Sequence, residues 1–270
     1  MAESLTVLIV GGGGREDAIS HAYEKSSHVD RIIVAPGNDF IAYERQKEVI
    51  TDGNCSLKDP KSILKIARKY EPDLVDVAQD DALAMGTVDL LMKEFDVFGP
   101  TKKESRIEWD KMWSRKFMKR HKIPAPHFWS FNSDIEGKNY VRKLYQENPT
   151  REIYVKATGL TGGKGALKAK NLDEGLKNVE KMKNFGNAGE VFLIEEGLVG
   201  EEFSCYAISD GKNYHVFKSA QDNKRAFNFD DGEQTGGMGA ISPAMVMEPI
   251  TEEIEEELIS RAINGMRKEG

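Results

Sequence analysis

The chain has 270 residues, of which 39% are hydrophobic and 31% charged, and its formal net charge is −7 at pH 7. This length and composition predict a globular protein of about two domains, and the acidic balance argues against non-specific binding to nucleic acid. The only cysteines, Cys55 and Cys205, exclude a disulfide framework or a cysteine-based metal cluster and favour a reducing compartment, the cytoplasm.

The first hundred residues alternate short apolar runs with amphipathic stretches. We expect buried parallel strands at LTVLIV (5–10), RIIVAP (31–36), LVDVA (74–78) and DVFGP (96–100). Helical patterns separate these strands at 16–26, 59–70 and 82–95. This alternation predicts a doubly wound α/β domain. The run LTVLIV is too short for a signal-peptide core or a membrane span, so no membrane partner is expected.

Four glycines, 11–14, follow the first expected strand and open the first expected helix. A loop in that place points backbone N–H groups and the helix dipole at an anion. It departs from the dinucleotide pattern G-x-G-x-x-G, because Glu16 stands where the third glycine belongs and the second strand ends without an acidic residue for a ribose. NAD is therefore disfavoured. A terminal phosphate of a small substrate and a tight structural turn are the two remaining interpretations.

After residue 105 a helix is expected to run to about His121, and the two prolines of KIPAPHF then mark a change of unit. The following stretch is rich in strand patterns, at 127–131, 152–157, 166–170, 190–196, 202–211 and 213–220. Helices are expected at 134–147 and 171–184, which together with the hairpins predicts an α+β domain. A charged helix at 251–270 ends the chain.

The segment KATGLTGGKGALKAK, 156–170, places four glycines between two expected strands. Glycines allow close approach of backbone N–H groups to an anion, and the lysines supply positive charge. The segment is not a Walker phosphate loop, because Lys164 is followed by Gly165 and more strand instead of Ser or Thr and a helix. It is either a phosphate-binding loop of another kind or a glycine-rich hairpin with solvated lysines.

Two later segments also combine charge with loop-forming residues. The first, at 190–204, places Glu195 and Glu196 at a strand end and Glu201 and Glu202 at the start of the next, where they either contact a nucleotide or are simply solvated. The second, at 219–243, joins charged side chains to the glycine loop 235–239. A long polar segment inside a compact domain is more often functional or mobile than structural.

Eight collinear segments together resemble the phosphoribosylamine–glycine ligase (GAR synthetase) family of ATP-grasp enzymes in purine biosynthesis. They are GGGGRE, VAPGN, FGPTK, DKMWSRKFMKRHKIPAP, VKATGLTGGKG, IEEGLVGEEFS, SAQDNKR and TGGMGAISP. The resemblance implies that ATP phosphorylates glycine and that the amine of 5-phosphoribosylamine then displaces phosphate from the glycyl phosphate. It also implies a Rossmann-like substrate domain at 1–103 and an ATP-grasp domain at 104–270, with a lid subdomain at about 126–198.

The resemblance implies a role for each matching position. ATP would be bound by Lys111, Lys156, Gly162, Gly163, Lys164, Gly165, Glu195, Glu196, Gly197, Leu198, Glu202 and Lys224, with 159–165 as a closing lid and 195–198 as the adenine hinge. Asp222 and Arg225 would lie near the reacting substrates as catalytic residues. Substrate would be bound by Gly12, Gly13, Gly14, Arg15, Gly236, Gly237, Met238 and Gly239.

The sequence departs from the family pattern at several positions. Asp17 replaces a histidine, AQDDAL (78–83) replaces GPEAPL, and Gln234 replaces an asparagine. The family's Mg²⁺ or Mn²⁺ ligands belong to a segment beyond residue 270, so no metal ligand is expected within the chain. We expect a fragment, with the rest supplied as a separate C-terminal chain if the gene is split. The alternatives are another ATP-grasp carboxylate–amine ligase and a non-catalytic nucleotide-binding module.

Overall fold

The structure, a computed structural model, describes residues 4–229 and 231–270. The chain divides into two compact units, Met1–Trp109 and Asp110–Gly270, here named unit 1 and unit 2. None of the helices in the described ranges has the length and apolar character needed to cross a bilayer.

Unit 1 is built on a parallel sheet of five strands in the order β3-β2-β1-β4-β5. The strands are β1 (Leu5–Gly11), β2 (Val29–Pro36), β3 (Glu48–Thr51), β4 (Leu74–Val77) and β5 (Val97–Phe98). The expected strands are confirmed, although β5 is shorter than its apolar run. The edge strand β3 was not expected, because EVIT is short and only partly buried.

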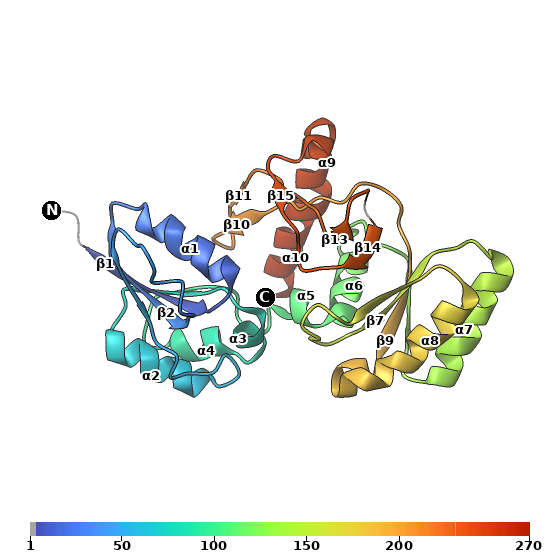
Figure 1. Cartoon of the computed structure of the whole chain (residues 1–270), viewed down its shortest axis with the longest axis horizontal. Coiled ribbons are helices and arrows are strands. Elements are labelled where there is room, and N and C mark those ends of the chain that lie inside the picture. Colours follow the sequence, from blue (N-terminus) through green and yellow to red (C-terminus); the bar gives the residue numbers. More distant parts are fainter. Residues whose placement is uncertain (1–3, 230) are drawn as a thin grey trace. The chain divides into compact units, whose positions relative to one another are not determined.

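Helices cover both faces of this sheet (Figure 1). They are α1 (Gly14–Glu24), α2 (Pro60–Tyr70), α3 (Asp80–Ala84) and α4 (Thr87–Leu91). Alternate residues of β1 serve the two faces: Leu8 and Val10 pack with α2 and α4, whereas Val7 and Ile9 pack on the face that α1 covers. A strand buried on both faces reads as a continuous apolar run, which is why these strands were predictable.

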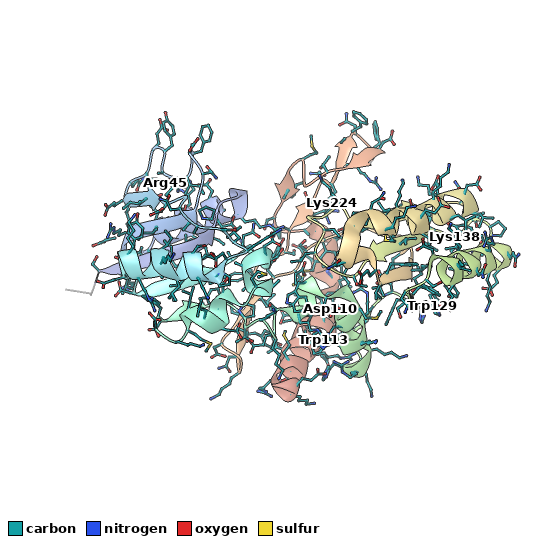
Figure 2. The ribbon with its side chains drawn as sticks, turned by 90° about the horizontal axis from the view of Figure 1, so that it is seen from below. Arg45, Asp110, Trp113, Trp129, Lys138 and Lys224 are labelled. Atoms are coloured by element: carbon teal, nitrogen blue, oxygen red, sulfur yellow. The ribbon has the colours of Figure 1, made fainter. Side chains whose placement is uncertain are left out.

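The prediction of one continuous helix at 82–95 is wrong, because this stretch forms two helices. The chain breaks between α3 and α4 at Gly86, whose φ of 81° lies in the left-handed region that glycine adopts without strain. The helix expected to run to His121 is likewise two helices, α5 (Arg106–Trp109) and α6 (Lys111–Arg120). Asp110 separates them and caps α6, because its carboxylate accepts a bond of 3.0 Å from the Trp113 amide. Figure 2 labels both residues.

Unit 2 begins with α6 and an antiparallel sheet in the order β6-β9-β7-β8. The strands are β6 (Phe128–Phe131), β7 (Ile153–Ala157), β8 (Ala166–Ala169) and β9 (Phe192–Glu196). One face packs against α7 (Asp134–Glu147), α8 (Leu172–Lys181) and the 3-10 segment η1 (Met182–Gly189). The packing is tight: a Cβ on Gly137 of α7 would lie 2.6 Å from a ring carbon of Phe192.

The rest of unit 2 consists of short strand pairs followed by helix. The pairs are β10 (Ala207–Ser209) with β11 (Tyr214–Val216), β12 (Gln221–Asp222) with β15 (Ala240–Ile241), and β13 (Arg225–Phe227) with β14 (Asp231–Gln234). The strands expected at 202–211 and 213–220 are therefore much shorter than predicted. The helical end comprises η2 (Met245–Ile250), α9 (Thr251–Ile254), the π-helical η3 (Glu255–Ser260) and α10 (Arg261–Glu269), which confirms the expected charged helix.

Candidate functional site

A buried carboxylate lies at the centre of the best-defined polar cluster in unit 2. The alternation of β7 turns Ile153 and Val155 into the core, so Tyr154 and Lys156 lie on the opposite face. Glu195 of β9 is the register partner of Tyr154, which places it diagonally next to Lys156 on that face. The Lys156 ammonium lies 2.6 Å from Oε2 of Glu195.

The second cation of this cluster comes from α6. Nε of Arg115 donates to Oε1 of Glu195 at 2.5 Å, and its Nη2 donates to Oε2 at 3.2 Å. Glu195 is 1% exposed, whereas the side chains of Arg115 and Lys156 are 19% and 21% exposed. Burial acts to raise the pKa of Glu195, but the Arg115 bond and the charges of Lys156 and Arg115 outweigh it and lower the pKa. We name these three residues the Glu195 cluster.

Lys111 enters the same region from the first turn of α6. Its amide donates to the Thr158 carbonyl at 2.9 Å, and its ammonium lies 3.4 Å from the Gly159 carbonyl. Lys111 and Arg115 are four residues apart and therefore share one face of the helix. The structure thus brings Lys111 to the base of the glycine hairpin that follows Lys156.

The glycine hairpin, 159–165, connects β7 to β8 as the sequence predicts. Gly162 and Gly163 have φ values of 60° and 80°, and a Cβ at either position would meet nothing within 4 Å. The hairpin closes through bonds from the Lys164 amide to the Thr161 carbonyl, 3.3 Å, and from the Ala157 amide to the Gly165 carbonyl, 2.9 Å. Its tip, from Gly162 to Lys164, is exposed.

The segment predicted as an adenine hinge, 195–198, continues β9 beyond the cluster. The Glu196 amide donates to the His127 carbonyl at 3.1 Å, and the Gly197 amide donates to the Glu152 carbonyl at 2.8 Å. Leu198 is 67% exposed. The segment therefore combines fixed backbone with an uncovered apolar side chain.

The glycine loop 235–239 folds back on the segment 222–224, at the end of β12. The Asn223 amide donates to the Gly239 carbonyl and the Met238 amide to the Asn223 carbonyl, at 2.9 and 2.8 Å. A Cβ on Gly237 would lie 3.0 Å from the Asp222 carboxylate. Asp222 therefore lies against this loop, whose Gly236 and Gly239 complete the turn.

The remaining charged residues of this region pair separately. Lys224, labelled in Figure 2, forms an ion pair with Glu202. Arg225 donates from Nη1 to the Gly232 carbonyl at 3.0 Å, within the β13–β14 hairpin, and not to Asp222. The structure thus brings Lys224 to Glu202 and Asp222 to the glycine loop. Arg225 instead bonds the Gly232 carbonyl within its own hairpin.

In unit 1 the predicted phosphate loop follows β1, next to the carboxyl end of β4. The strand order reverses between these two strands, and ligands of doubly wound sheets bind outside such a point. The amides of Gly12 and Gly13 both donate to Oε2 of Glu16, at 3.2 and 2.6 Å. Two of the amides expected to face a phosphate are thus satisfied by the protein's own carboxylate, while Gly14 and Arg15 are exposed. Substrate binding by this loop stays a prediction.

A second buried carboxylate, Asp76 of β4, lies in the same unit and is 6% exposed. Its Oδ2 accepts a bond of 3.0 Å from the Tyr23 hydroxyl. Burial raises the pKa of Asp76, the Tyr23 bond opposes that shift, and the charge of Glu16 adds to it. Burial and the Asp76 charge also raise the pKa of Tyr23.

Three features of these sites were not predicted from the sequence: Arg115, Glu16 as a cap, and the pair of Tyr23 with Asp76. Arg115 had one usable signal, its spacing of four residues from Lys111 within a helical stretch. Its partner is 80 residues away in the chain and could not be identified from spacing. In the described ranges, no group of three or more His, Cys, Asp or Glu side chains gathers that could hold a metal ion.

Comparisons with known proteins agree with this division into units. Residues 5–108 match the family model of the phosphoribosylglycinamide synthetase N domain, and residues 109–270 match that of its ATP-grasp (A) domain. The phosphoribosylamine–glycine ligase of Chlorobaculum tepidum is 35% identical over 271 residues, which are 98% of this chain and 62% of the relative. The trifunctional purine biosynthetic protein adenosine-3 of Drosophila pseudoobscura pseudoobscura is 38% identical over 98% of this chain and 20% of its own length.

A solved structure shows the same fold. The crystal structure of phosphoribosylamine–glycine ligase from Thermotoga maritima superposes with a TM-score of 0.77 at 26% identity, and the match covers 98% of this chain and 62% of that one. The chain thus spans about three-fifths, or less, of the length of these relatives.

Proposed function

The chain belongs to the phosphoribosylglycinamide synthetase family, and we propose that it contributes the ATP-binding and substrate-binding parts of an enzyme that joins glycine to 5-phosphoribosylamine. The products are glycinamide ribonucleotide, ADP and phosphate. Unit 1 is proposed as the substrate domain predicted at 1–103. Unit 2 is proposed as the ATP-grasp domain predicted at 104–270, with its lid at about 126–198.

The observation that carries this proposal is the convergence of two lysines on one glycine hairpin. Lys156 is the penultimate residue of the strand that enters the hairpin, and the Lys111 ammonium lies 3.4 Å from the carbonyl of Gly159 at its base. Two ammonium groups beside a flexible loop suit the anionic tail of a nucleotide, since lysine is a common phosphate ligand. The exposed tip at Gly162 and Gly163 is free to fold over that tail.

The chemistry proceeds by positioning and charge neutralisation. The glycine carboxylate attacks the terminal phosphoryl group and ADP leaves. The amine then attacks the carbonyl carbon of glycyl phosphate, phosphate leaves and the amine loses a proton. No side-chain nucleophile is needed, so the lysines act by offsetting phosphate charge while the reactants are held together. A divalent metal supplies further neutralisation in enzymes of this kind, and no metal ligand is assigned to the described residues.

The other predicted roles stay proposals around this centre. The hinge 195–198 is proposed for adenine, Glu202 for the ribose hydroxyls and Lys224 for the phosphates. Asp222, with the loop 235–239, is proposed for the reacting substrates, and so is Arg225, which also bonds the Gly232 carbonyl. The two cysteines are free thiols, which suits a reducing compartment, and we propose the cytoplasm.

The experiment that tests the proposal measures ATP binding to the purified chain. ATP should protect residues 156–170 from limited proteolysis, because the hairpin closes over the nucleotide. Lys156→Ala should weaken ATP binding by about 1.5–3 kcal/mol, the value of a charge-assisted contact. The matched control is Lys168→Ala, which also removes a lysine with a carboxylate partner, Glu152 at 2.8 Å. Unchanged affinity in Lys156→Ala would refute the assignment.

A further inference from the structure

Arg115 is the one member of the Glu195 cluster for which the proposed chemistry gives no role. Its guanidinium serves both oxygens of Glu195, at 2.5 and 3.2 Å, whereas Lys156 contacts Oε2 alone. The cluster therefore holds one negative and two positive charges. When Lys156 leaves the carboxylate, Glu195 still has a bidentate partner.

Because Glu195 is buried, its stability depends on whether Arg115 is present as a second partner. A carboxylate that is 1% exposed cannot be compensated by water, and a buried charge without a partner is strongly destabilising. With Lys156 as its only counterion, Glu195 would hold the ammonium in place. Arg115 removes that requirement, because its planar fork remains on the carboxylate while Lys156 moves on its flexible four-carbon stem.

We propose that Arg115 is a positioning residue for the nucleotide: by neutralising Glu195 it releases the Lys156 ammonium to exchange the carboxylate for a phosphate. The inference rests on the proposed function in that it assumes a nucleotide phosphate as the ligand of Lys156. It adds a residue that does not itself touch the nucleotide. Lys156 pairs with Glu195, and its ammonium moves to the phosphate when ATP binds.

The first experiment compares ATP dissociation constants for Arg115 variants. Arg115→Met should raise the dissociation constant about tenfold or more, because Glu195 then retains Lys156. Arg115→Lys keeps the charge and should stay within about threefold of the wild type. The double variant Arg115→Met/Glu195→Gln should bind ATP as tightly as Glu195→Gln alone, because the carboxylate that traps Lys156 is gone from both. A purely structural role of Arg115 would not be rescued in this way.

A matched control comes from the same helix. Arg120 of α6 makes an equivalent bidentate pair with Glu269, at 2.9 and 2.8 Å. Arg120→Met should leave ATP affinity unchanged. If Arg115→Met fails to fold, the double variant is compared with Glu195→Gln, and both should bind ATP alike. A double variant that binds about tenfold more weakly than Glu195→Gln would overturn the proposal.

A second readout needs no nucleotide and separates this inference from the proposed function. Reductive methylation of Lys156, followed by mass spectrometry, reports how firmly its amine is held in the free protein. Modification should be slower in Arg115→Met than in the wild type, and faster in Arg115→Met/Glu195→Gln. A wild-type chain that does not bind ATP would refute the proposed function, while the labelling rates still decide whether Arg115 competes for Glu195. Equal labelling in all variants would overturn the inference.

Discussion

Asp76 in unit 1 and Glu195 in unit 2 are both buried carboxylates on strands, and they are 6% and 1% exposed. Glu195 has two cations as partners, and its pKa is lowered although burial acts to raise it. Asp76 has the neutral hydroxyl of Tyr23 and the nearby charge of Glu16, and its pKa is raised. The same desolvation therefore has opposite outcomes in the two units, according to the charge of the neighbours.

This difference indicates what each carboxylate can do. Glu195 is held ionised and acts as a fixed negative charge that sets the position of Lys156 and Arg115. Asp76 is stabilised in its protonated form and is the more readily neutralised of the two. The buried carboxylate thus positions two cationic side chains in unit 2, whereas in unit 1 it makes the stability depend on pH.

The largest expected effect comes from removing the charge of Glu195. Glu195→Gln should lower the free energy of unfolding of unit 2 by about 3 kcal/mol, because Arg115 and Lys156 lose their shared partner. Native-state hydrogen exchange of peptides from β7 and β9, measured by mass spectrometry, reports this for unit 2 separately. The control Glu190→Gln changes an exposed carboxylate just before β9 and should alter stability by less than about 0.5 kcal/mol. Equal effects in both variants would contradict the role given to the cations.

A smaller effect of opposite sign is expected in unit 1. Asp76→Asn removes a buried charge but retains an acceptor for the Tyr23 hydroxyl. It should therefore raise the free energy of unfolding of unit 1 at pH 7 by up to about 1 kcal/mol. The control is Asp73→Asn, an exposed carboxylate that accepts a bond of 2.7 Å from the Thr6 amide, which should give no gain. Destabilisation by Asp76→Asn would show that the ionised carboxylate is needed.

The smallest effect is the pH dependence of that gain. The folded-state pKa of Asp76 is raised, so its ionisation penalty is full above that pKa and disappears as the pH falls toward the unfolded value of about 3.9. The gain from Asp76→Asn should therefore fade between pH 7 and pH 4. Glu195 has a lowered pKa, so the loss in Glu195→Gln should persist until the pH falls below about 4.3. Urea unfolding of both variants and the wild type at several pH values tests both expectations. If the stability changes of Asp76→Asn and Glu195→Gln vary with pH in the same way, the two carboxylates do not differ as described.

The fold was predictable where burial is symmetrical. The strands at Leu5–Gly11 and Val29–Pro36 are covered on both faces and appear as apolar runs. The edge strand Glu48–Thr51 was missed because half-buried residues leave no such run. The split of the helix at Gly86 depends on a local backbone conformation, since an isolated glycine is also compatible with continuous helix.

The sequence singled out Lys111 and Lys156 as candidates but did not indicate their partners. Lys111 follows the helix-capping Asp110, and Lys156 precedes the glycines of 159–165, so both stand in segments that can be recognised. Arg115 and Glu195 come together only through packing of α6 on the sheet face opposite the core, and no spacing encodes that contact. Glu16 was noted only as a missing glycine, although its side chain reaches the amides that such a glycine would leave open.

The Glu16 side chain at the start of α1 also has a consequence for selectivity. It behaves as a ligand tethered to its own receptor, with an effective concentration on the order of millimolar or above. Free inorganic phosphate would have to displace it from the amides of Gly12 and Gly13, and it would do so poorly because it has no further attachment to the protein. A phosphorylated molecule that makes further contacts elsewhere in unit 1 would displace the Glu16 carboxylate more readily, because those contacts add to its binding free energy. An internal anion of this kind would make the loop insensitive to fluctuations in cellular phosphate.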